Sequence, residues 1–398
     1  MSNFSMSRIA GPRMARGQWA MRIVLLGGAG EIGSEVARDL AAQPEIESLV
    51  IADLDGGRAA ELAHRLDRRG LSDRRVDIRD RESALELVAG ADLLMNCASF
   101  VLFDDVFRLA LEARVDYADL LSEPTADHRR AAANAGITAI SGLGASPGLS
   151  NVLVRHASEE LDELREVNIS WISLRTIAPT PGLLDTILWE LSEECPTRRY
   201  YQDGRHRRAA FLEGSRRVEF APPVGRQLVY YVPHTEVTTL PRHFPMLRDC
   251  AVRGSWRPEL MADLAVLERH GLLSPAAIES TKEAIWQRHG GIRDAAPWML
   301  YVNVEVDGRR DGQPVRRSYN VSHPVHWGER GVARMTAVPA AVGAQLLARY
   351  GRIATGFVDP EEYYDPREFL ETLGRRGGVT VERAETRVPA QLRQPSRA

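Results

Sequence analysis

The first half of the chain alternates short apolar runs with segments of helical periodicity. Residues 21–26 form an apolar run of strand length, followed directly by a glycine-rich turn at 27–33 and a helical segment at 34–42. The same alternation continues, with apolar runs at 49–52, 93–95 and 137–140 and helical stretches at 57–69, 81–89 and 105–113. Strands and helices in this order form a parallel sheet with right-handed crossovers. The pattern predicts an α/β fold with a doubly wound parallel sheet.

Beyond about residue 160 the pattern becomes one of single-residue alternation. Residues 298–307 alternate, and Asp311-Gly312 forms the turn into a second strand at 315–321. One face of the first strand carries Leu300, Val302, Val304 and Val306, and the other carries Tyr301, Asn303 and Glu305. This predicts an antiparallel hairpin with one solvated face. Strands at 167–174 and 227–232 and helices at 258–270 and 276–289 complete a second, α+β domain with a mixed or antiparallel sheet.

These patterns predict the domain organisation. We expect the parallel-sheet domain at 21–150 and the second domain at 151–330. Helices at 331–385 are expected to pack back on the first domain, chiefly through an amphipathic helix at 335–350 and also through 366–373. Residues 1–20 and 386–398 lack periodicity, so both ends are predicted to be disordered.

Composition narrows the classes of function. Against 54 acidic residues the chain has 51 basic ones, a formal charge of −3, which argues against binding to nucleic acid or to an anionic membrane. The sequence has no apolar run of about 20 residues and no secretory signal, so we expect a cytoplasmic protein. Cys97, Cys195 and Cys250 are far apart, which predicts neither a disulfide nor a metal site. Lys282 is the only lysine, so lysine-based catalysis is disfavoured.

The glycine turn carries the strongest chemical motif. Gly28, Gly30 and Gly33 form G-x-G-x-x-G between a strand and a helix, the pattern with which a Rossmann domain binds a dinucleotide pyrophosphate. Asp53 ends the second strand, where its carboxylate can accept hydrogen bonds from ribose hydroxyls. The carboxylate would repel a 2′-phosphate, so NAD is favoured, although Arg58 keeps NADP possible. The residues expected to bind the cofactor here are Gly28, Ala29, Gly30, Glu31, Ile32, Gly33 and Asp53.

Further candidates follow later strands of the predicted parallel sheet. Loops at the carboxyl ends of parallel strands line the ligand crevice. The residues predicted to contact the cofactor from such loops are Asn96, Ala98, Ser99, Gly144, Pro147 and Gly148. Asp77, at the end of the third strand, could contact the adenine or could be a solvated strand-end aspartate.

At this point the sequence resembles the saccharopine dehydrogenase family. The resemblance lies in the G-x-G-x-x-G motif, the Tyr117-Ala118-Asp119-Leu120 strand and the Gly142–Gly148 loop, with weaker similarity in 238–245, 253–254 and 335–361. Within the family the lysine 6-dehydrogenases are the most similar. The resemblance implies hydride transfer between a nicotinamide and the carbon of an amine or imine, in an amino acid such as lysine or a related amine. A homodimer or larger homo-oligomer is expected.

Several positions depart from the lysine 6-dehydrogenase pattern, and they bear on the substrate. A glycine pair is replaced by the run that ends at Glu123, small residues by Glu236-Val237, and a double glycine by Ser173–Thr176. We expect these positions, Glu123 and Glu236 among them, to line the substrate side of the cleft. The resemblance therefore supports the family's cofactor chemistry for this chain more strongly than it supports lysine as the substrate.

The reaction needs a proton acceptor and charges that hold the substrate. Asp119 is the first candidate for the proton acceptor or amine anchor and His234 the second, while Arg242 and Arg253 could bind a substrate carboxylate. Each of these residues could instead be structural or a solvated surface charge. Two alternative functions stay open: a dehydrogenase that reduces a condensed imine, as in opine or carboxynorspermidine-type synthesis, and a non-catalytic NAD-binding protein.

Overall fold

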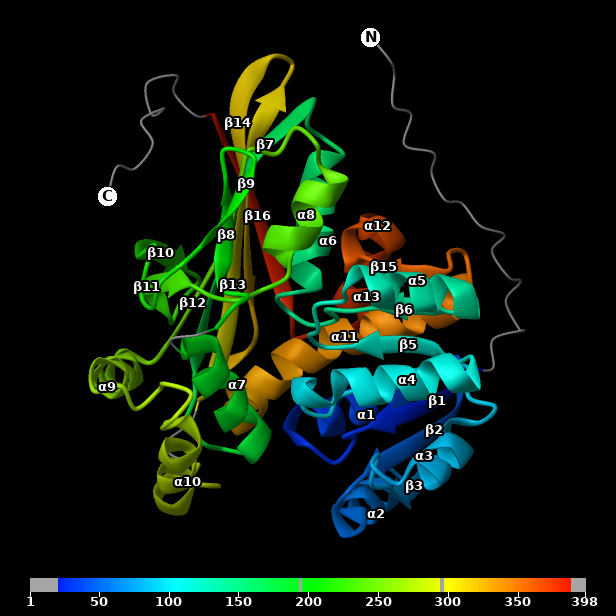
Figure 1. Ribbon diagram of the computed structural model, residues 1–398. Helices are drawn as coiled ribbons and strands as arrows, with labels where there is room; N and C mark the ends of the chain where they lie inside the picture. Colours follow the sequence, from blue (N-terminus) through cyan, green and yellow to red (C-terminus); the bar gives the residue numbers. More distant parts are fainter. Residues whose placement is uncertain (1–20, 193–194, 294–296, 388–398) are drawn as a thin grey trace. The chain divides into compact units, whose positions relative to one another are not determined.

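The computed structural model describes residues 21–192, 195–293 and 297–387, and these form two compact units. The first unit comprises the described residues up to 141 together with 340–358. The second comprises 142–339 and the described residues from 359 onward. Each unit has a sheet of its own, and Figure 1 labels the elements of both.

The first unit is built on a parallel sheet whose strand order reverses beside β1. Within the described residues it has seven strands in the order β15-β6-β5-β4-β1-β2-β3. The strands are β1 Met21–Leu26, β2 Ile46–Asp53, β3 Leu71–Arg75, β4 Leu93–Asn96, β5 Asp116–Asp119, β6 Thr138–Ile140 and β15 Gly356–Val358. The order from β3 to β6 is that of a Rossmann domain, in which ligands bind beyond the carboxyl ends of the strands at the reversal point. The predicted doubly wound parallel sheet is confirmed.

Helices connect these strands, and several begin at polar caps. They are α1 Glu31–Ala41, α2 Gly56–Leu66, α3 Arg81–Val88, α4 Phe103–Ala113 and α5 Ala126–Ala135, with a short 3-10 helix, η1 Phe100–Leu102, before α4. Asp55 caps α2, Asp80 caps α3 and Thr125 caps α5, each by accepting a hydrogen bond from a first-turn amide. Helices α1 to α4 thus begin within a few residues of the predicted positions, whereas α5 was not predicted.

The first unit is completed by a segment from far along the chain. Helix α11 (Gly331–Tyr350) leads to β15, which pairs with β6, and the Phe357 ring lies 4.9 Å from that of Phe107. The predicted amphipathic character of the helix is wrong, because the consecutive residues Ala340, Ala341 and Val342 are all fully buried. An amphipathic helix would expose at least one of three neighbours.

By length and composition alone, one helix in the described part of the chain could cross a membrane. It is Val325–Tyr350, which includes the 3-10 segment η2 (Val325–Arg330), and the mean hydropathy of its most apolar 18-residue stretch is 1.2. Of this stretch, 83% is buried, as expected for the core helix of a folded protein.

The second unit is built on a mixed sheet around the long strand β7. Its strand order is β10-β11-β12-β7-β13-β14-β16, with β8 paired to β12 and to β9. The strands are β7 Glu163–Leu174, β8 Arg199–Gln202, β9 Arg205–Arg208, β10 Arg216–Phe220, β11 Gly225–Tyr231, β12 Asp249–Trp256, β13 Met299–Arg310, β14 Gln313–Ser322 and β16 Thr380–Arg387. β12 runs parallel to β7, whereas β13 runs antiparallel to it. The predicted α+β domain with a mixed sheet is confirmed.

The helices of the second unit come from separate parts of its sequence. They are α6 Leu149–Ser158, α7 Pro181–Leu191, α8 Glu236–His243, α9 Pro258–Arg269, α10 Ile278–His289, α12 Pro360–Tyr363 and α13 Pro366–Arg376. Helix α6 contacts β7 and β13 and also α12 and α13. Residues from 359 onward therefore complete the second unit.

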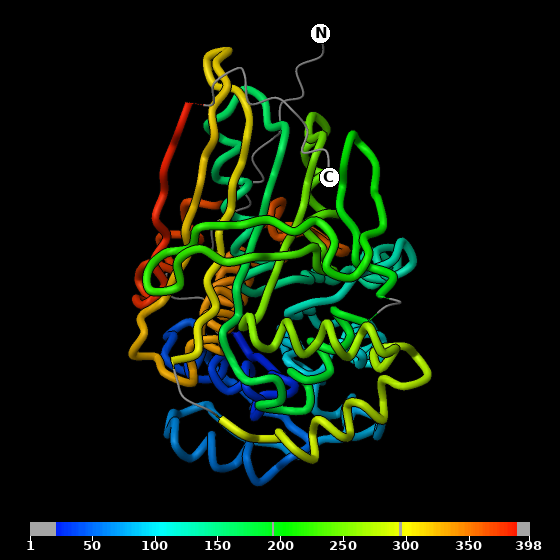
Figure 2. Tube along the Cα trace, turned by 90° about the vertical axis from the view of Figure 1, so that its left-hand side faces the viewer, coloured from blue at the N-terminus to red at the C-terminus, as the bar shows by residue number. Residues whose placement is uncertain are grey.

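The predicted hairpin is present, but one of its faces is not solvated as expected. Strands β13 and β14 pair antiparallel around Asp311 and Gly312, both with positive φ, as a tight hairpin turn requires. In Figure 2 the hairpin (yellow) lies beside β16 (red), its paired neighbour. Tyr301 and Asn303, expected on the solvated face, are 2% and 6% exposed. Both are covered because other parts of the second unit pack on that face too.

Other boundaries also differ from the predictions. The first unit ends at residue 141 rather than 150, and residues 366–373, expected to pack on it, belong to the second unit. Asp77 lies two residues beyond the end of β3. The predicted disorder of 1–20 and 388–398 falls outside the described residues, whereas residues 386 and 387 end β16.

Candidate active site

The glycine turn after β1 packs as the dinucleotide motif requires. A Cβ on Gly33 would lie 2.1 Å from the Gly27 carbonyl oxygen, and one on Gly27 would lie 2.6 Å from the backbone nitrogen of Ala98. Helix α1 begins directly at Glu31, so its first amides have no acceptor within the helix. The turn thus presents a compact backbone and a helix N-terminus at the reversal point of the sheet.

Asp53 shapes this turn as well as ending β2. One carboxylate oxygen accepts a hydrogen bond from the amide of Ala29 at 2.9 Å, and the other from the amide of Asp55 at 3.0 Å. Each oxygen keeps further lone pairs for a ribose hydroxyl. Sequence reasoning missed Arg75, which pairs in register with Asp53 and lies against Gly56 at the start of α2.

The loop after β4 lies across the reversal point from this turn. Asn96 accepts a hydrogen bond from the amide of Ala98, which fixes the loop. The Ser99 hydroxyl is buried and has no hydrogen-bond partner among the described residues. A buried hydroxyl left unpaired is costly unless a ligand satisfies it.

These groups fit a nicotinamide dinucleotide. Gly28, Ala29, Gly30, Glu31, Ile32 and Gly33 form or begin the turn, Asp53 adjoins it, and Asn96, Ala98 and Ser99 follow the neighbouring strand. Asp77 is instead paired with Arg79 at 2.6 Å, and this hydrogen bond lowers the pKa of Asp77 to about 2. Its placement favours the solvated strand-end aspartate over a contact with adenine.

Asp119, the first candidate for the proton acceptor, is held by three hydroxyl groups. One of its oxygens accepts from Tyr117 at 2.9 Å and from Ser122 at 2.6 Å, and the other accepts from Ser141 at 2.8 Å. The carboxyl group is 3% exposed. Asp119 therefore ties the end of β5 to the segment after β6, which favours the structural alternative that the sequence left open. Glu123 lies half-buried just beyond.

The loop at 142–148 belongs to the second unit, with residues from a distant segment. Gly148 precedes α6 and its amide donates to Asn151. The Ser146 hydroxyl donates to Glu236 at 2.6 Å and lies 3.3 Å from Nδ1 of His234. Gly144, Pro147 and Gly148, predicted to bind cofactor, thus shape a loop that contacts His234, a candidate proton acceptor, and Glu236, a predicted substrate-side residue.

His234 and Glu236 lie together in a buried polar cluster. The His234 ring stacks on Trp171 with ring centroids 5.6 Å apart, and burial lowers the pKa of His234. Glu236 is fully buried, and one of its oxygens accepts from both Ser146 and Ser150. The other oxygen has no hydrogen-bond partner among the residues described. Glu236 also opens α8, where the helix dipole favours a negative charge.

Glu190 joins this cluster, and sequence reasoning missed it. Its carboxyl oxygen Oε1 lies 3.9 Å from Nε2 of His234, and its Oε2 has no hydrogen-bond partner in the described part of the chain. Burial raises the pKa of Glu190 to about 8, with Arg175 acting in the opposite direction. A lone acidic residue in the otherwise apolar end of α7 (TILWEL) was the sequence feature that could have revealed it.

The cluster continues through buried amide and carboxyl groups. Asn151 donates from Nδ2 to Thr239 at 3.1 Å and to Glu361 at 2.9 Å. Burial raises the pKa of Glu361, and the nearby Asp359 acts in the same direction. Several ionisable groups are therefore buried together on this side of the second unit, as in many active sites.

The two arginines predicted to bind a carboxylate are occupied elsewhere. Arg253 donates to the Gly214 carbonyl, to Asn168 and to the Tyr231 hydroxyl, and its guanidinium lies over the Tyr231 ring. Arg253 lies on β12 in register with Ser170, one position before the Gly254–Trp171 pair, so its side chain leaves the sheet on the face opposite to that of Trp171. This placement gives Arg253 a structural role.

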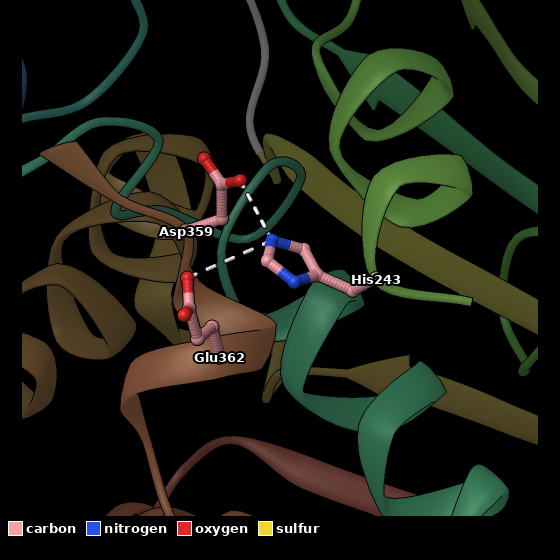
Figure 3. Close-up of side chains that lie close together, drawn as sticks. All are labelled: His243, Asp359 and Glu362. Carbon is pink, nitrogen blue, oxygen red and sulfur yellow. Dashed lines mark hydrogen bonds and ion pairs between the residues drawn. The ribbon is translucent and has the colours of Figure 1, made fainter. Parts of the chain in front are cut away.

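Arg242 belongs to a charged group at the end of α8, part of which Figure 3 shows. Arg242 lies 2.5 Å from Asp359, and His243 lies 2.8 Å from the same carboxylate and 3.8 Å from Glu362. Burial lowers the pKa of His243, but its hydrogen bond to Asp359 and the charges of Glu361, Asp359 and Glu362 together outweigh this effect and raise the pKa overall. His243, Asp359 and Glu362 could hold a metal ion by distance, but Arg242 already supplies a cation to Asp359.

Comparison with known proteins identifies the family. Residues 23–140 match the saccharopine dehydrogenase NADP binding domain, and residues 144–379 match the saccharopine dehydrogenase C-terminal domain. The chain belongs to the saccharopine dehydrogenase family. It is therefore an NAD(P)-dependent dehydrogenase, and the predicted resemblance is confirmed. The junction between the two matched domains coincides with the boundary between the two structural units.

Individual relatives are distant in sequence but similar over nearly their whole length. The chain is 24% identical to carboxyaminopropylagmatine dehydrogenase from Synechocystis sp., over 90% of this chain and 96% of the relative. It is also 24% identical to carboxynorspermidine synthase from Vibrio alginolyticus, over 87% and 93%. Saccharopine dehydrogenase (L-Glu forming) from Saccharomyces cerevisiae shares the fold with a TM-score of 0.68 at 15% identity, covering 92% of this chain and 100% of that one.

Proposed function

We propose that the protein forms or cleaves the C–N bond of a secondary amine that joins a cationic amine to a carboxylate-bearing group. In the reductive direction an imine gains a hydride at carbon and a proton at nitrogen. In the oxidative direction the amine loses both, and water hydrolyses the resulting imine. A bound nicotinamide dinucleotide supplies or accepts the hydride.

The observation that carries this proposal is the buried group around His234. Glu190 and Glu236 lie on either side of its ring, and each has one carboxyl oxygen without a hydrogen-bond partner among the described residues. Unpaired acidic oxygens in a dry site are costly, and a cationic ammonium or iminium group would satisfy them. An alcohol substrate would offer no such charge.

His234 is suited to move the proton. Burial lowers its pKa, so the ring is neutral near pH 7 and can accept a proton from an ammonium group. The Ser146 hydroxyl lies beside Nδ1 and donates to Glu236, so it holds the ring next to a carboxylate that stabilises the protonated form. Trp171 restrains the ring from one face. We assign the proton transfer to His234 rather than to Asp119, whose oxygens already bind three hydroxyls.

The named relatives bear on the choice of substrate. Sequence reasoning puts a basic amino acid such as lysine first and a condensed imine second. The names carboxyaminopropylagmatine dehydrogenase and carboxynorspermidine synthase both describe carboxylated amines, which favours the second. We therefore place a carboxylated di- or polyamine ahead of lysine.

For the cofactor we keep the preference for NAD. The Asp53 carboxylate disfavours a 2′-phosphate. The neighbouring Arg75, in register with Asp53, is the residue through which NADP could still be accepted.

A turnover assay with a matched panel tests the proposal. Purified protein is given NAD or NADP with a carboxylated secondary amine, with lysine, and with an alcohol of similar length, and formation of reduced nicotinamide is followed by absorbance. We expect the carboxylated secondary amine to be oxidised with the highest kcat/KM. Preference for the alcohol, or binding of the cofactor without turnover of any member, would contradict the proposal.

A further inference from the structure

A small charged pocket lies at the carboxyl ends of two strands in the second unit. It has a volume of about 330 Å³, and Arg175, Arg257, Glu259, Asp263 and His289 contribute its polar lining. Arg175 directly follows β7 and Arg257 directly follows β12, and these two strands are parallel neighbours. The sequence pattern placed Arg175 in the run Ser173–Thr176, which was expected to line the substrate side, but it did not single out Arg257.

We propose that this pocket binds the α-amino-carboxylate head group of the substrate, at the end opposite the reacting nitrogen. This inference rests on the proposed function, because it identifies the carboxylate-bearing partner as an amino acid.

Arg175 and Arg257 form the positively charged side of the pocket, and a nitrogen of Arg257 has no hydrogen-bond partner among the described residues. Arg175 is 4% exposed, and its guanidinium donates to the carbonyls of Thr176 and Leu183, so its charge is fixed at the pocket wall. The Nε atom of Arg257 is buried and makes no hydrogen bond within the described residues. A buried guanidinium nitrogen of this kind is costly unless a carboxylate or similar acceptor binds it.

Two acidic side chains form the negatively charged side of the same pocket. Glu259 and Asp263 stand one turn apart on α9, and both line the pocket. In the part of the chain that the structure describes, neither carboxylate forms an ion pair, although Arg257 lines the same cavity. Opposite charges held apart across a cavity of this size match a zwitterion, whose carboxylate faces the arginines and whose ammonium faces the acids.

The pocket and the His234 cluster share structural supports. Arg175 acts electrostatically on Glu190, the carboxyl group beside His234. Helix α7, which carries Glu190, packs on α10, which carries His289, and Lys282 pairs with Asp185 between these helices at 2.6 Å. A substrate with a cationic amine at one end and an amino-acid head group at the other would therefore meet a suitable site at each end.

The test compares Arg257→Gln, at the residue that precedes α9, with Arg269→Gln, at an exposed arginine at the end of α9 that lies outside the pocket. Each variant is assayed with a secondary amine bearing an α-amino acid and with its carboxamide analogue. We expect Arg257→Gln to raise KM for the carboxylate substrate about tenfold or more, with little change in kcat, and to remove the preference over the carboxamide. Arg269→Gln should behave as wild type. Equal KM values in the two variants would overturn the pocket assignment.

Direct binding separates failure of this inference from failure of the proposed function. If the wild type turns over no C–N substrate, the function fails, and calorimetry with free L-norvaline then tests the pocket alone. Binding to wild type that Arg257→Gln weakens about tenfold or more would support the head-group site. No binding of L-norvaline to wild type would overturn it.

Discussion

At the scale of single residues, the cluster around His234 holds more acidic groups than the unliganded protein can satisfy. Glu190 and Glu236 are buried with one unpaired oxygen each, on either side of a histidine that burial keeps neutral. Such an arrangement lowers stability in the empty state and favours a cationic ligand. Two consequences can be measured on the free protein and on single variants.

The first concerns stability against pH. Burial raises the pKa of Glu190 from 4.5 to about 8, so the native state keeps a proton that the unfolded state has already lost. The free energy of unfolding should therefore fall as pH rises between these two values. Glu190→Gln should flatten this fall in denaturant titrations, whereas Glu82→Gln, at an exposed position on α3, should not. An unchanged slope in Glu190→Gln would show that Glu190 is not a buried acid.

The second consequence is that single variants can distinguish His234 from Asp119 as the residue that transfers the proton. His234→Gln should lower kcat about 10²-fold or more with unchanged Tm, because it removes a positioned base. Asp119→Asn should instead lower Tm, since an amide nitrogen cannot accept from the hydroxyls that Asp119 holds. A large loss of kcat in Asp119→Asn with unchanged Tm, and none in His234→Gln, would return the role to Asp119.

Asp53 yields a third prediction at this scale. Wild type should bind NAD at least several-fold more tightly than NADP, and Asp53→Ala should narrow the difference. Asp77→Ala is the matched control, because Asp77 is a strand-end aspartate paired with Arg79. Tighter binding of NADP than of NAD to wild type, measured by calorimetry, would refute the ribose assignment.

At the scale of elements, the first unit depends on a segment far from it in sequence. The Phe357 ring on β15 packs among the buried residues of the first unit, close to Phe107 and Tyr117. Phe357→Ala should lower the free energy of unfolding by about 3 kcal/mol or more. Val101→Ala, at a position 67% exposed, should have little effect on the free energy of unfolding.

The same dependence predicts the effect of removing the distant segment. A chain ending at Arg330 lacks both α11 and β15, so it should not fold as a soluble NAD-binding protein.

Many of the strands and helices could be predicted from the spacing of apolar residues along the chain, because apolar residues recur with a different period in a strand than in a helix. The strand at 21–26 and the hairpin turn at Asp311-Gly312 follow from local patterns. Burial of Tyr301 could not be predicted, because it depends on what packs on the outer face of β13. The charged group of Arg242 and Asp359 joins residues 117 positions apart, which no local pattern reveals.

At the scale of the whole molecule, the candidate cofactor site and the proposed amine site belong to different units. The first unit carries the glycine turn and Asp53, and the second carries His234, Glu190 and the charged pocket near Arg257. The cofactor motif could be predicted because its spacing is dictated by backbone geometry. Of the residues in the proposed amine site, Glu236 and His234 were candidates from the sequence, whereas Glu190 could not be predicted, because it matters through its burial and a missing hydrogen-bond partner.

The most direct test of the amine site is the number of protons released when an amine binds. Calorimetry at pH 7 is run in buffers of different ionisation enthalpy, with a carboxylated polyamine added to the protein and reduced cofactor. The reduced form cannot accept a hydride from the amine, so no proton comes from turnover. Because Glu190 should be protonated in the absence of the amine and ionised beside a cation, we expect release of about one proton in wild type and almost none in Glu190→Gln. Binding to wild type without proton release, or no binding of the amine at all, would contradict the account.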